Sequence, residues 1–249
     1  MLTTTSPLSQ ATDSKREIVR LQSVCKYYGQ DDTLVKALDQ VSFVIKEGEY
    51  CSIMGASGSG KSTCMNIIGC LDSCTSGQYF LDEQDVSGMA ETELARVRNL
   101  KLGFVFQQYH LLAQLTALEN VMLPMAYANV PPKEQKERAM VALERVAMGH
   151  RLHSRPNQMS GGQQQRVAIA RAIVNNPVML LADEPTGALD SHTTNEVMQL
   201  FGELNASGIT VVMVTHEADV ARNTKRIIWF RDGQIVNDHL SPDDLGHVM

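Results

Sequence analysis

The residues best suited to chemistry lie in a glycine-rich loop in the first quarter of the chain. In order they are Gly55, Ala56, Ser57, Gly58, Ser59, Gly60, Lys61, Ser62 and Thr63. They fit the phosphate-loop pattern G-x-x-x-x-G-K-[ST], in which small residues let backbone N–H groups close around a β-phosphate. Lys61 would reach the β- and γ-phosphates, and the Ser62 hydroxyl would bind Mg²⁺. A Gly/Ser-rich loop can match this pattern by chance, so the surrounding elements must decide.

Two adjacent acids form a second candidate site about 120 residues further on. Asp183 and Glu184 follow the apolar run 178–182. A carboxylate at the end of a buried strand is costly unless it faces a cation, and a metal-bound nucleotide supplies one. Asp183 would then hold Mg²⁺, directly or through water. Glu184 would act on the water that attacks the γ-phosphate, as its general base or by positioning it.

The patterns around the glycine loop indicate strands on its N-terminal side. Apolar and polar residues alternate over Glu17–Tyr28, which is typical of a half-buried strand and places Tyr28 on its polar face. Shorter strands are predicted at 41–45 and 50–54, separated by a turn at Glu47-Gly48. The glycine loop therefore stands between a strand and a helix, as phosphate binding requires.

The second half of the chain combines a helical pattern with buried strands. Between Pro131 and Gly149, apolar residues recur at helical spacing, namely Ala139, Met140, Leu143, Val146 and Ala147. For this helix we favour core packing in a small helical subdomain over a partner-binding or membrane-surface role. The apolar runs 178–182 and 210–214 are typical of strands buried on both faces of a parallel sheet. An α/β architecture with a helical insertion is therefore predicted.

Composition and charge limit the class of protein. The chain has 249 residues, of which 43% are hydrophobic and 20% charged, which suits one large domain or one domain with an insertion. A formal net charge of −6 argues against a nucleic-acid partner, because such proteins usually carry a basic surplus. No run approaches the roughly 18 to 20 apolar residues of a membrane-spanning helix. The five cysteines include no C-x-x-C pair, so we expect neither a disulfide framework nor a zinc site.

A third motif, Ser160-Gly161-Gly162-Gln163, indicates the type of ATPase. Together with Gln107, Ala188-Leu189-Asp190 and His216, it resembles the signature, Q-loop, D-loop and H-loop of the ABC ATPase family. These motifs occur in the family's order and cover nearly the whole chain. Taken alone, His216 could equally be a core histidine, but its place after the predicted strand 210–214 favours the family's role.

The resemblance implies the fold and the assembly. It implies a P-loop NTPase core with an antiparallel β subdomain and a helical subdomain, spanning residues 17–241 with the helical part at about 108–160. Residues 1–16 would be a flexible N-terminal tail, and residues 242–249 a C-terminal tail. In this family two subunits face each other head to tail, so a homodimer is implied. The phosphate loop of one subunit and the residues Ser160, Gly161, Gly162 and Gln163 of the other would then enclose each ATP.

The resemblance also implies roles for single residues. The catalytic residues would be Glu184, His216, Gln107 and Lys61, and the Mg²⁺ ligands would be Ser62, Gln107 and Asp183. ATP and Mg²⁺ are thus the expected cofactors. Tyr28 looks like the aromatic residue that stacks on adenine in this family, and an ordinary surface tyrosine is the alternative.

Within the family, the segments 106–112, 115–120 and 182–190 resemble the group that contains the macrolide exporter ATPase MacB and the lipoprotein-extraction ATPase LolD. This implies a peripheral subunit on the cytoplasmic face of the inner membrane that drives a separate permease subunit, for export or for transmitting force to the periplasm. A periplasmic adaptor and an outer-membrane channel would be reached through that permease. A scaffold ATPase of the iron–sulfur assembly type and a cell-division ATPase without cargo are the alternatives. The cargo cannot be inferred, because specificity lies in the partners.

Overall fold

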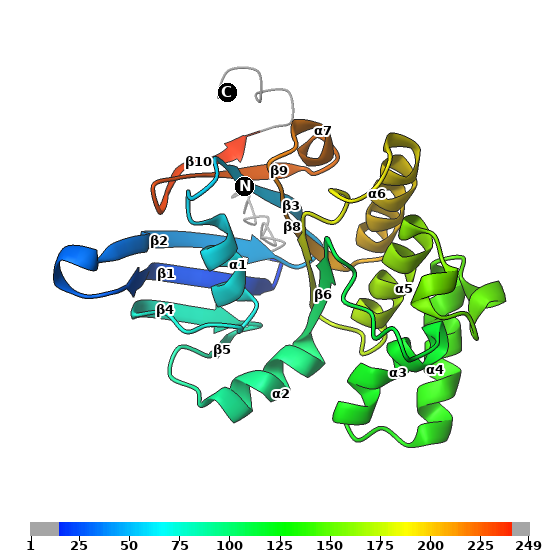
Figure 1. The fold of residues 1–249 in the computed structure, drawn as a ribbon. Helices are drawn as coiled ribbons and strands as arrows, with labels where there is room; N and C mark the ends of the chain where they lie inside the picture. Colours follow the sequence, from blue (N-terminus) through cyan, green and yellow to red (C-terminus); the bar gives the residue numbers. More distant parts are fainter. Residues whose placement is uncertain (1–14, 241–249) are drawn as a thin grey trace, which may run out of the picture.

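The computed structural model describes residues 15–240, whose strands form two sheets that share a hydrophobic core (Figure 1). The predicted tails lie outside the described residues, except for Lys15 and Arg16. Arg16 forms a 2.5 Å ion pair with Asp82. The domain boundaries remain a prediction.

The first sheet is antiparallel, with the strand order β2-β1-β4-β5. Its strands are β1 (Glu17–Tyr28), β2 (Val35–Lys46), β4 (Ser76–Leu81) and β5 (Gln84–Asp85). The alternation predicted for β1 is interrupted, because its pairing with β2 shifts between Leu21 and Val24. Ser23 lies in this bulge with a φ of 47°, and Val24 and Cys25 are both buried. Tyr28 is 42% exposed, in agreement with the polar face predicted for it.

The second sheet has the order β10-β9-β3-β8-β7-β6 and is parallel from β9 to β6. Its strands are β3 (Tyr50–Gly55), β6 (Leu102–Phe106), β7 (Met179–Asp183), β8 (Thr210–Val214), β9 (Arg226–Arg231) and β10 (Gln234–Leu240). The register aligns the ends of the parallel strands. Val214 pairs with Ile53 on one side and with Asp183 on the other, and Asp183 pairs with Phe106. The residues that follow β3, β6, β7 and β8 therefore meet at one edge of the sheet, where open α/β sheets bind ligands.

Helices cover both faces of this sheet (Figure 1). They are α1 (Lys61–Ile68), α2 (Glu91–Lys101), α3 (Ala117–Tyr127), α4 (Pro132–Arg145), α5 (Gly161–Ile173), α6 (Ser191–Ala206) and α7 (Ala218–Ala221), with short 3₁₀ turns at Asp31–Thr33, Gly149–Arg151 and Pro156–Gln158. In β8, Val211 packs in the core with α3 to α6, whereas Val212 packs in the core with α1 and the first sheet. This burial on both faces confirms the interpretation of the apolar run 210–214.

The predicted amphipathic helix is α4, which is shorter than the expected span 131–149. Ala139 and Leu143 are buried in the core with α3 and α5, which confirms the predicted core packing. Ala147 lies beyond the end of the helix, with a φ of 58°, and is exposed. Its assignment to the apolar face is therefore wrong, because the backbone has already turned out of the helical conformation.

Candidate functional site

The glycine loop joins β3 to α1, as its motif predicts. The Lys61 ammonium donates hydrogen bonds to the backbone oxygens of Gly55 at 2.8 Å and Ala56 at 2.7 Å. The backbone of the loop thus accepts hydrogen bonds from the side chain of the loop's own lysine. The Ser59 hydroxyl is buried and has no hydrogen-bond partner in the described part of the chain. An anion in the loop would give Lys61 a better acceptor than two carbonyl oxygens, because charged hydrogen bonds are stronger.

Glycine is required where the loop meets the rest of the fold. Gly60 has a φ of 104°, and a Cβ atom there would lie 2.5 Å from the backbone oxygen of Ala37. Gly233, in the turn between β9 and β10, donates its N–H to the Ser59 oxygen at 3.0 Å. A hollow of about 390 Å³ opens between Gly60, Lys61 and this turn. The loop is therefore supported from β2 and from the β9–β10 turn, two contacts that the local motif does not indicate.

The two acids lie at the end of β7, beside Lys61. Burial raises the pKa of the Asp183 carboxyl and the Glu184 charge raises it further, while Lys61 opposes both. Burial lowers the pKa of Lys61, and the charges of Glu184 and Asp183 oppose this shift. No donor among the described residues forms a hydrogen bond with the Asp183 carboxylate. A half-buried carboxylate without such a partner is suited to a cation.

Glu184 is held by residues that follow β8. Its backbone has a φ of 44°, a left-handed conformation that is unfavourable for a residue with a side chain. Its Oε1 atom lies 2.7 Å from Nδ1 of His216 and accepts the backbone N–H of His216 at 3.2 Å. The Thr215 hydroxyl donates to Oε2 at 3.1 Å. The structure therefore brings Glu184 and His216 together, and adds Thr215, which the sequence did not single out.

Gln107 follows β6 and lies at the same edge of the sheet. Its side chain packs against the residues after Glu184: a Cβ atom on Gly187 would lie 2.6 Å from the Gln107 amide nitrogen. Gln165 of α5 donates to the backbone oxygen of Pro185 at 2.6 Å. The segment after the acids is thus in contact with both the predicted Q-loop and the signature helix.

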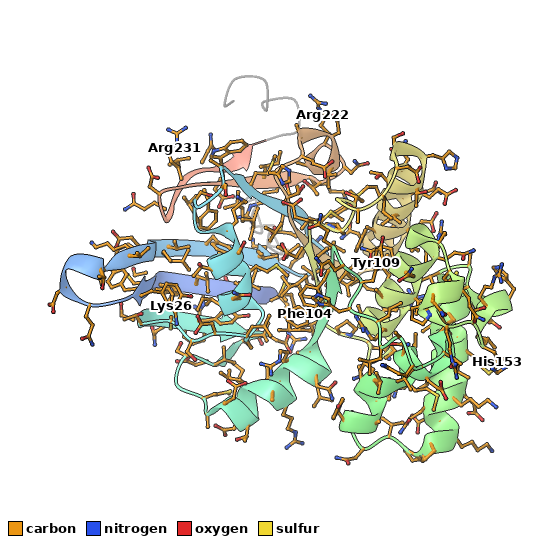
Figure 2. All side chains as sticks on the ribbon, in the orientation of Figure 1. Lys26, Phe104, Tyr109, His153, Arg222 and Arg231 are labelled. Carbon is orange, nitrogen blue, oxygen red and sulfur yellow. The ribbon has the colours of Figure 1, made fainter. Side chains whose placement is uncertain are left out.

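The signature motif forms the N-terminus of α5. The Ser160 hydroxyl accepts the N–H of Gln163 at 3.3 Å, and the Gln163 side chain accepts the N–H of Ser160 at 3.1 Å. Gly161 lies close to the hydroxyl of Tyr109, and Gly162 lies against Thr193. Tyr109 is labelled in Figure 2. Because α5 and α1 pack in cores on opposite faces of the sheet, the exposed helix start at Ser160 belongs to a different face from the glycine loop.

The donors present fit Mg²⁺ with a nucleotide. Mg²⁺ takes one or two protein oxygens and completes its shell with phosphate oxygens and water. The Asp183 carboxylate and the Ser62 hydroxyl, at the start of α1, are such donors. No cluster of three or more His, Cys, Asp or Glu ligands occurs within residues 15–240, so the phosphates would supply the remaining ligands.

A second hollow, of about 1010 Å³, lies on another side of the Gln107 segment. It is lined by residues of α2, β6, α3 and α5, among them Leu100, Phe106, His110, Tyr127 and Arg171. Tyr127 is 79% exposed. Arg171 donates to the backbone oxygens of Tyr109 at 2.8 Å and His110 at 2.6 Å. The lining is therefore apolar and basic, and it is continuous with the segment that begins at Gln107.

Comparisons with known proteins show which family the chain belongs to. The family model described as ABC transporter matches residues 38–187. An uncharacterized ABC transporter ATP-binding protein of Thermotoga maritima is 54% identical over 88% of this chain and 94% of its own length. The macrolide export ATP-binding/permease protein MacB of Hyphomonas neptunium is 49% identical over 89% of this chain, which spans only 34% of that protein.

Solved structures show the same fold. The dimeric ATP-binding cassette MJ0796, in a post-hydrolysis state bound to ADP and Pi, is 48% identical with a TM-score of 0.80, over 88% of this chain and 97% of that one. CbiO1 from Clostridium perfringens, part of an ABC transporter complex, is 26% identical with a TM-score of 0.83, over 94% and 92% of the two chains. The chain described here therefore belongs to the ABC transporter family and is an ATP-hydrolysing cassette with the predicted α/β P-loop fold.

Proposed function

We propose that two copies of this chain bind two Mg-ATP between them, hydrolyse the ATP and drive a separate membrane permease subunit. The observation that supports this most is the placement of α1 and α5 on opposite faces of the sheet. Each subunit then offers a phosphate loop and, on another face, an exposed signature helix start. Two subunits related by a two-fold axis would bring each loop to the partner's signature. The related cassette MJ0796 is dimeric.

The residues of the site divide the chemistry among them. Gly55 to Thr63 would hold the phosphates, with the Lys61 ammonium leaving its carbonyl partners for the β- and γ-phosphates. Ser62, Asp183 and Gln107 would hold Mg²⁺, which neutralises developing charge on the phosphates. The Glu184 carboxylate would accept the proton of the attacking water or orient it, with His216 keeping the carboxylate in place. Tyr28 would stack on adenine, and Ser160 to Gln163 of the second subunit would cap the γ-phosphate.

The membrane partner would dock in the hollow lined by Leu100, Phe106, Tyr127 and Arg171. We propose an amphipathic helix of the permease as its occupant, with an acidic side chain facing Arg171. Two facts support this: the lining is apolar and basic, and it continues into the segment that begins at Gln107. The relative MacB carries the word permease in its name, which supports a permease as the partner.

The wider setting follows from the same resemblance. The subunit would lie peripherally at the cytoplasmic face of the inner membrane. As a separate finding, residues 15–240 contain no helix with the length and apolar character of a membrane span. Export or force transmission to the periplasm, with an adaptor and an outer-membrane channel, belongs to the same proposal. The proposal also includes a cassette domain at 17–241 and a helical subdomain at about 108–160.

Crosslinking from native membranes, followed by reconstitution with the captured permease, tests this function. We expect the permease to stimulate ATP hydrolysis. Tyr127→Glu should weaken this stimulation while basal hydrolysis persists, because the new carboxylate in the hollow would repel the acidic side chain of the docking helix. A chain that crosslinks only to soluble assembly proteins would support the scaffold alternative. Stimulation without cargo movement in sealed vesicles would support the cell-division alternative.

A further inference from the structure

The proposed base platform, Tyr28, is tied down by a network outside the motifs. Its hydroxyl donates to Oδ2 of Asp72 at 2.8 Å. The other oxygen of Asp72 accepts the Lys26 ammonium at 2.6 Å and the N–H of Ser73 at 2.7 Å. Lys26 also donates to the Ser73 oxygen at 2.8 Å. The network therefore fastens the end of β1 to the loop that follows α1.

The charges of this network are partly shielded from water. The side chains of Lys26 and Asp72 are only 14% and 31% exposed. Burial raises the pKa of the Asp72 carboxyl, but the hydrogen bonds from Lys26, Tyr28 and Ser73 outweigh burial and hold the pKa below its usual value. Asp72 thus stays ionised at neutral pH and remains a strong acceptor for the Tyr28 hydroxyl.

The same network limits how the Tyr28 ring can be used. The Lys26 ammonium lies over the ring, 5.0 Å from its centroid, on the antiparallel sheet where β1 runs beside β4 (Figure 2). A base would therefore stack on the opposite face. Asp72, which accepts the Tyr28 hydroxyl, lies in the loop after α1, the helix that begins at the end of the phosphate loop. The ring is thus fixed relative to the place where the phosphates would bind.

We propose that Lys26 and Asp72 are positioning residues that hold the Tyr28 ring at a set angle and distance from the phosphate loop, and so favour a nucleoside triphosphate over a bare polyphosphate. This inference rests on the proposed role of Tyr28 in stacking. Without the network, the ring would turn about its side-chain bonds and lose part of its stacking energy, because ordering it would then cost entropy on binding. If Lys26 and Asp72 merely stabilised the sheet, they would not favour a ligand that carries a base over one that does not.

Equilibrium titration of the full chain without Mg²⁺, with ATP and with inorganic tripolyphosphate, tests the inference. Tyr28→Phe keeps the ring and removes its bond to Asp72, and Asp72→Ala removes the acceptor. Each should raise the Kd for ATP about threefold to tenfold, the usual cost of one hydrogen bond, and leave the Kd for tripolyphosphate unchanged. The double variant should lose no more than either single variant, because both remove the same bond.

Controls separate this inference from the role of Tyr28 itself. Glu134→Ala breaks the ion pair with Arg138 on α4 and should bind both ligands normally, and Lys26→Arg should retain most of the ATP affinity. If Tyr28→Ala weakens ATP binding but Tyr28→Phe and Asp72→Ala do not, the positioning network is refuted while the platform stands. Equal losses for ATP and tripolyphosphate in Asp72→Ala would also refute it. If Tyr28→Ala itself binds ATP normally, the platform in the proposed function fails.

Discussion

Nδ1 of His216 lies 2.7 Å from Oε1 of Glu184, so the side chains that follow two neighbouring parallel strands are in direct contact. Thr215 holds the second carboxylate oxygen. Because β7 and β8 pair in register up to Asp183 and Val214, this contact is set by the sheet. The Glu184 carboxylate is therefore oriented before any nucleotide binds.

His216→Ala should lower the rate of hydrolysis at saturating ATP about 10- to 100-fold, the usual effect of removing a group that orients another. ATP binding should change much less, because Glu184 and the phosphate loop remain. The readout is steady-state phosphate release. His192→Ala, an exposed histidine on α6 that pairs with Glu196, is the matched control. A normal rate for His216→Ala would remove His216 from the mechanism.

Tyr28→Ala should weaken ATP binding by roughly 1 to 3 kcal/mol, by analogy with base–aromatic stacking, and affect hydrolysis at saturation much less. Tyr27 is a suitable control because its hydroxyl donates to Asp39 at 2.8 Å and Lys36 lies over its ring. Equilibrium titration of Tyr28→Ala and of Tyr27→Ala with ATP shows which tyrosine contributes to binding. If Tyr27→Ala weakens ATP binding and Tyr28→Ala does not, then Tyr27 is the stacking residue and Tyr28 is not.

Asp183→Asn should stabilise the nucleotide-free chain and abolish Mg²⁺-dependent hydrolysis. The folded state raises the Asp183 pKa above the usual value of 3.8, so the ionised side chain opposes folding. This cost begins near the usual pKa, grows as the pH rises to the raised pKa and is constant above it. The Tm gain of the variant should therefore widen as the pH rises from about 4 and then level off. Thermal unfolding of both proteins across that pH range measures the difference in Tm. A Tm of Asp183→Asn below that of the parent at pH 7 would contradict the expected stabilisation.

Gln107→Ala should retain nucleotide binding and lose stimulation by the permease. Gln107 is in contact with Gly187 and begins the segment that lines the partner hollow, so it can relay docking to the site. ATP hydrolysis in vesicles, with and without the permease, measures the effect. Gln108→Ala removes the adjacent exposed amide and should be stimulated normally; full stimulation of Gln107→Ala would end the coupling role.

Contiguous motifs and strand patterns were enough to predict the α/β fold, the phosphate loop and the acids after β7. Contacts between distant residues could not be predicted this way. Asp72 is 46 positions from Lys26, and Gly233 supports the loop at Ser59, without any local pattern. Helix α3 lies within the predicted helical subdomain, but its own bounds do not follow from the sequence, because Pro124 lies inside it. Ala147 was misassigned because helical spacing continued past the point where the backbone turned left-handed.

In the proposed dimer, ATP would be enclosed by the phosphate loop of one subunit and Ser160 of the other. Glu184→Gln keeps the shape of the side chain but cannot accept the proton of water, and loss of such assistance typically lowers the rate by about 10² to 10⁴. It also removes a negative charge beside the γ-phosphate, so the ATP-bound pair should persist.

Light scattering after size exclusion, with ATP and Mg²⁺, tests this claim most directly. We expect a stable dimer for Glu184→Gln, and monomers once Ser160→Arg is added, because a long side chain at the start of α5 would block the cap. Glu184→Gln combined with Ser207→Arg, an exposed position beyond α6, should remain dimeric. An ATP-dependent dimer that persists with arginine at position 160, or hydrolysis by Glu184→Gln at the parental rate, would rule out this arrangement.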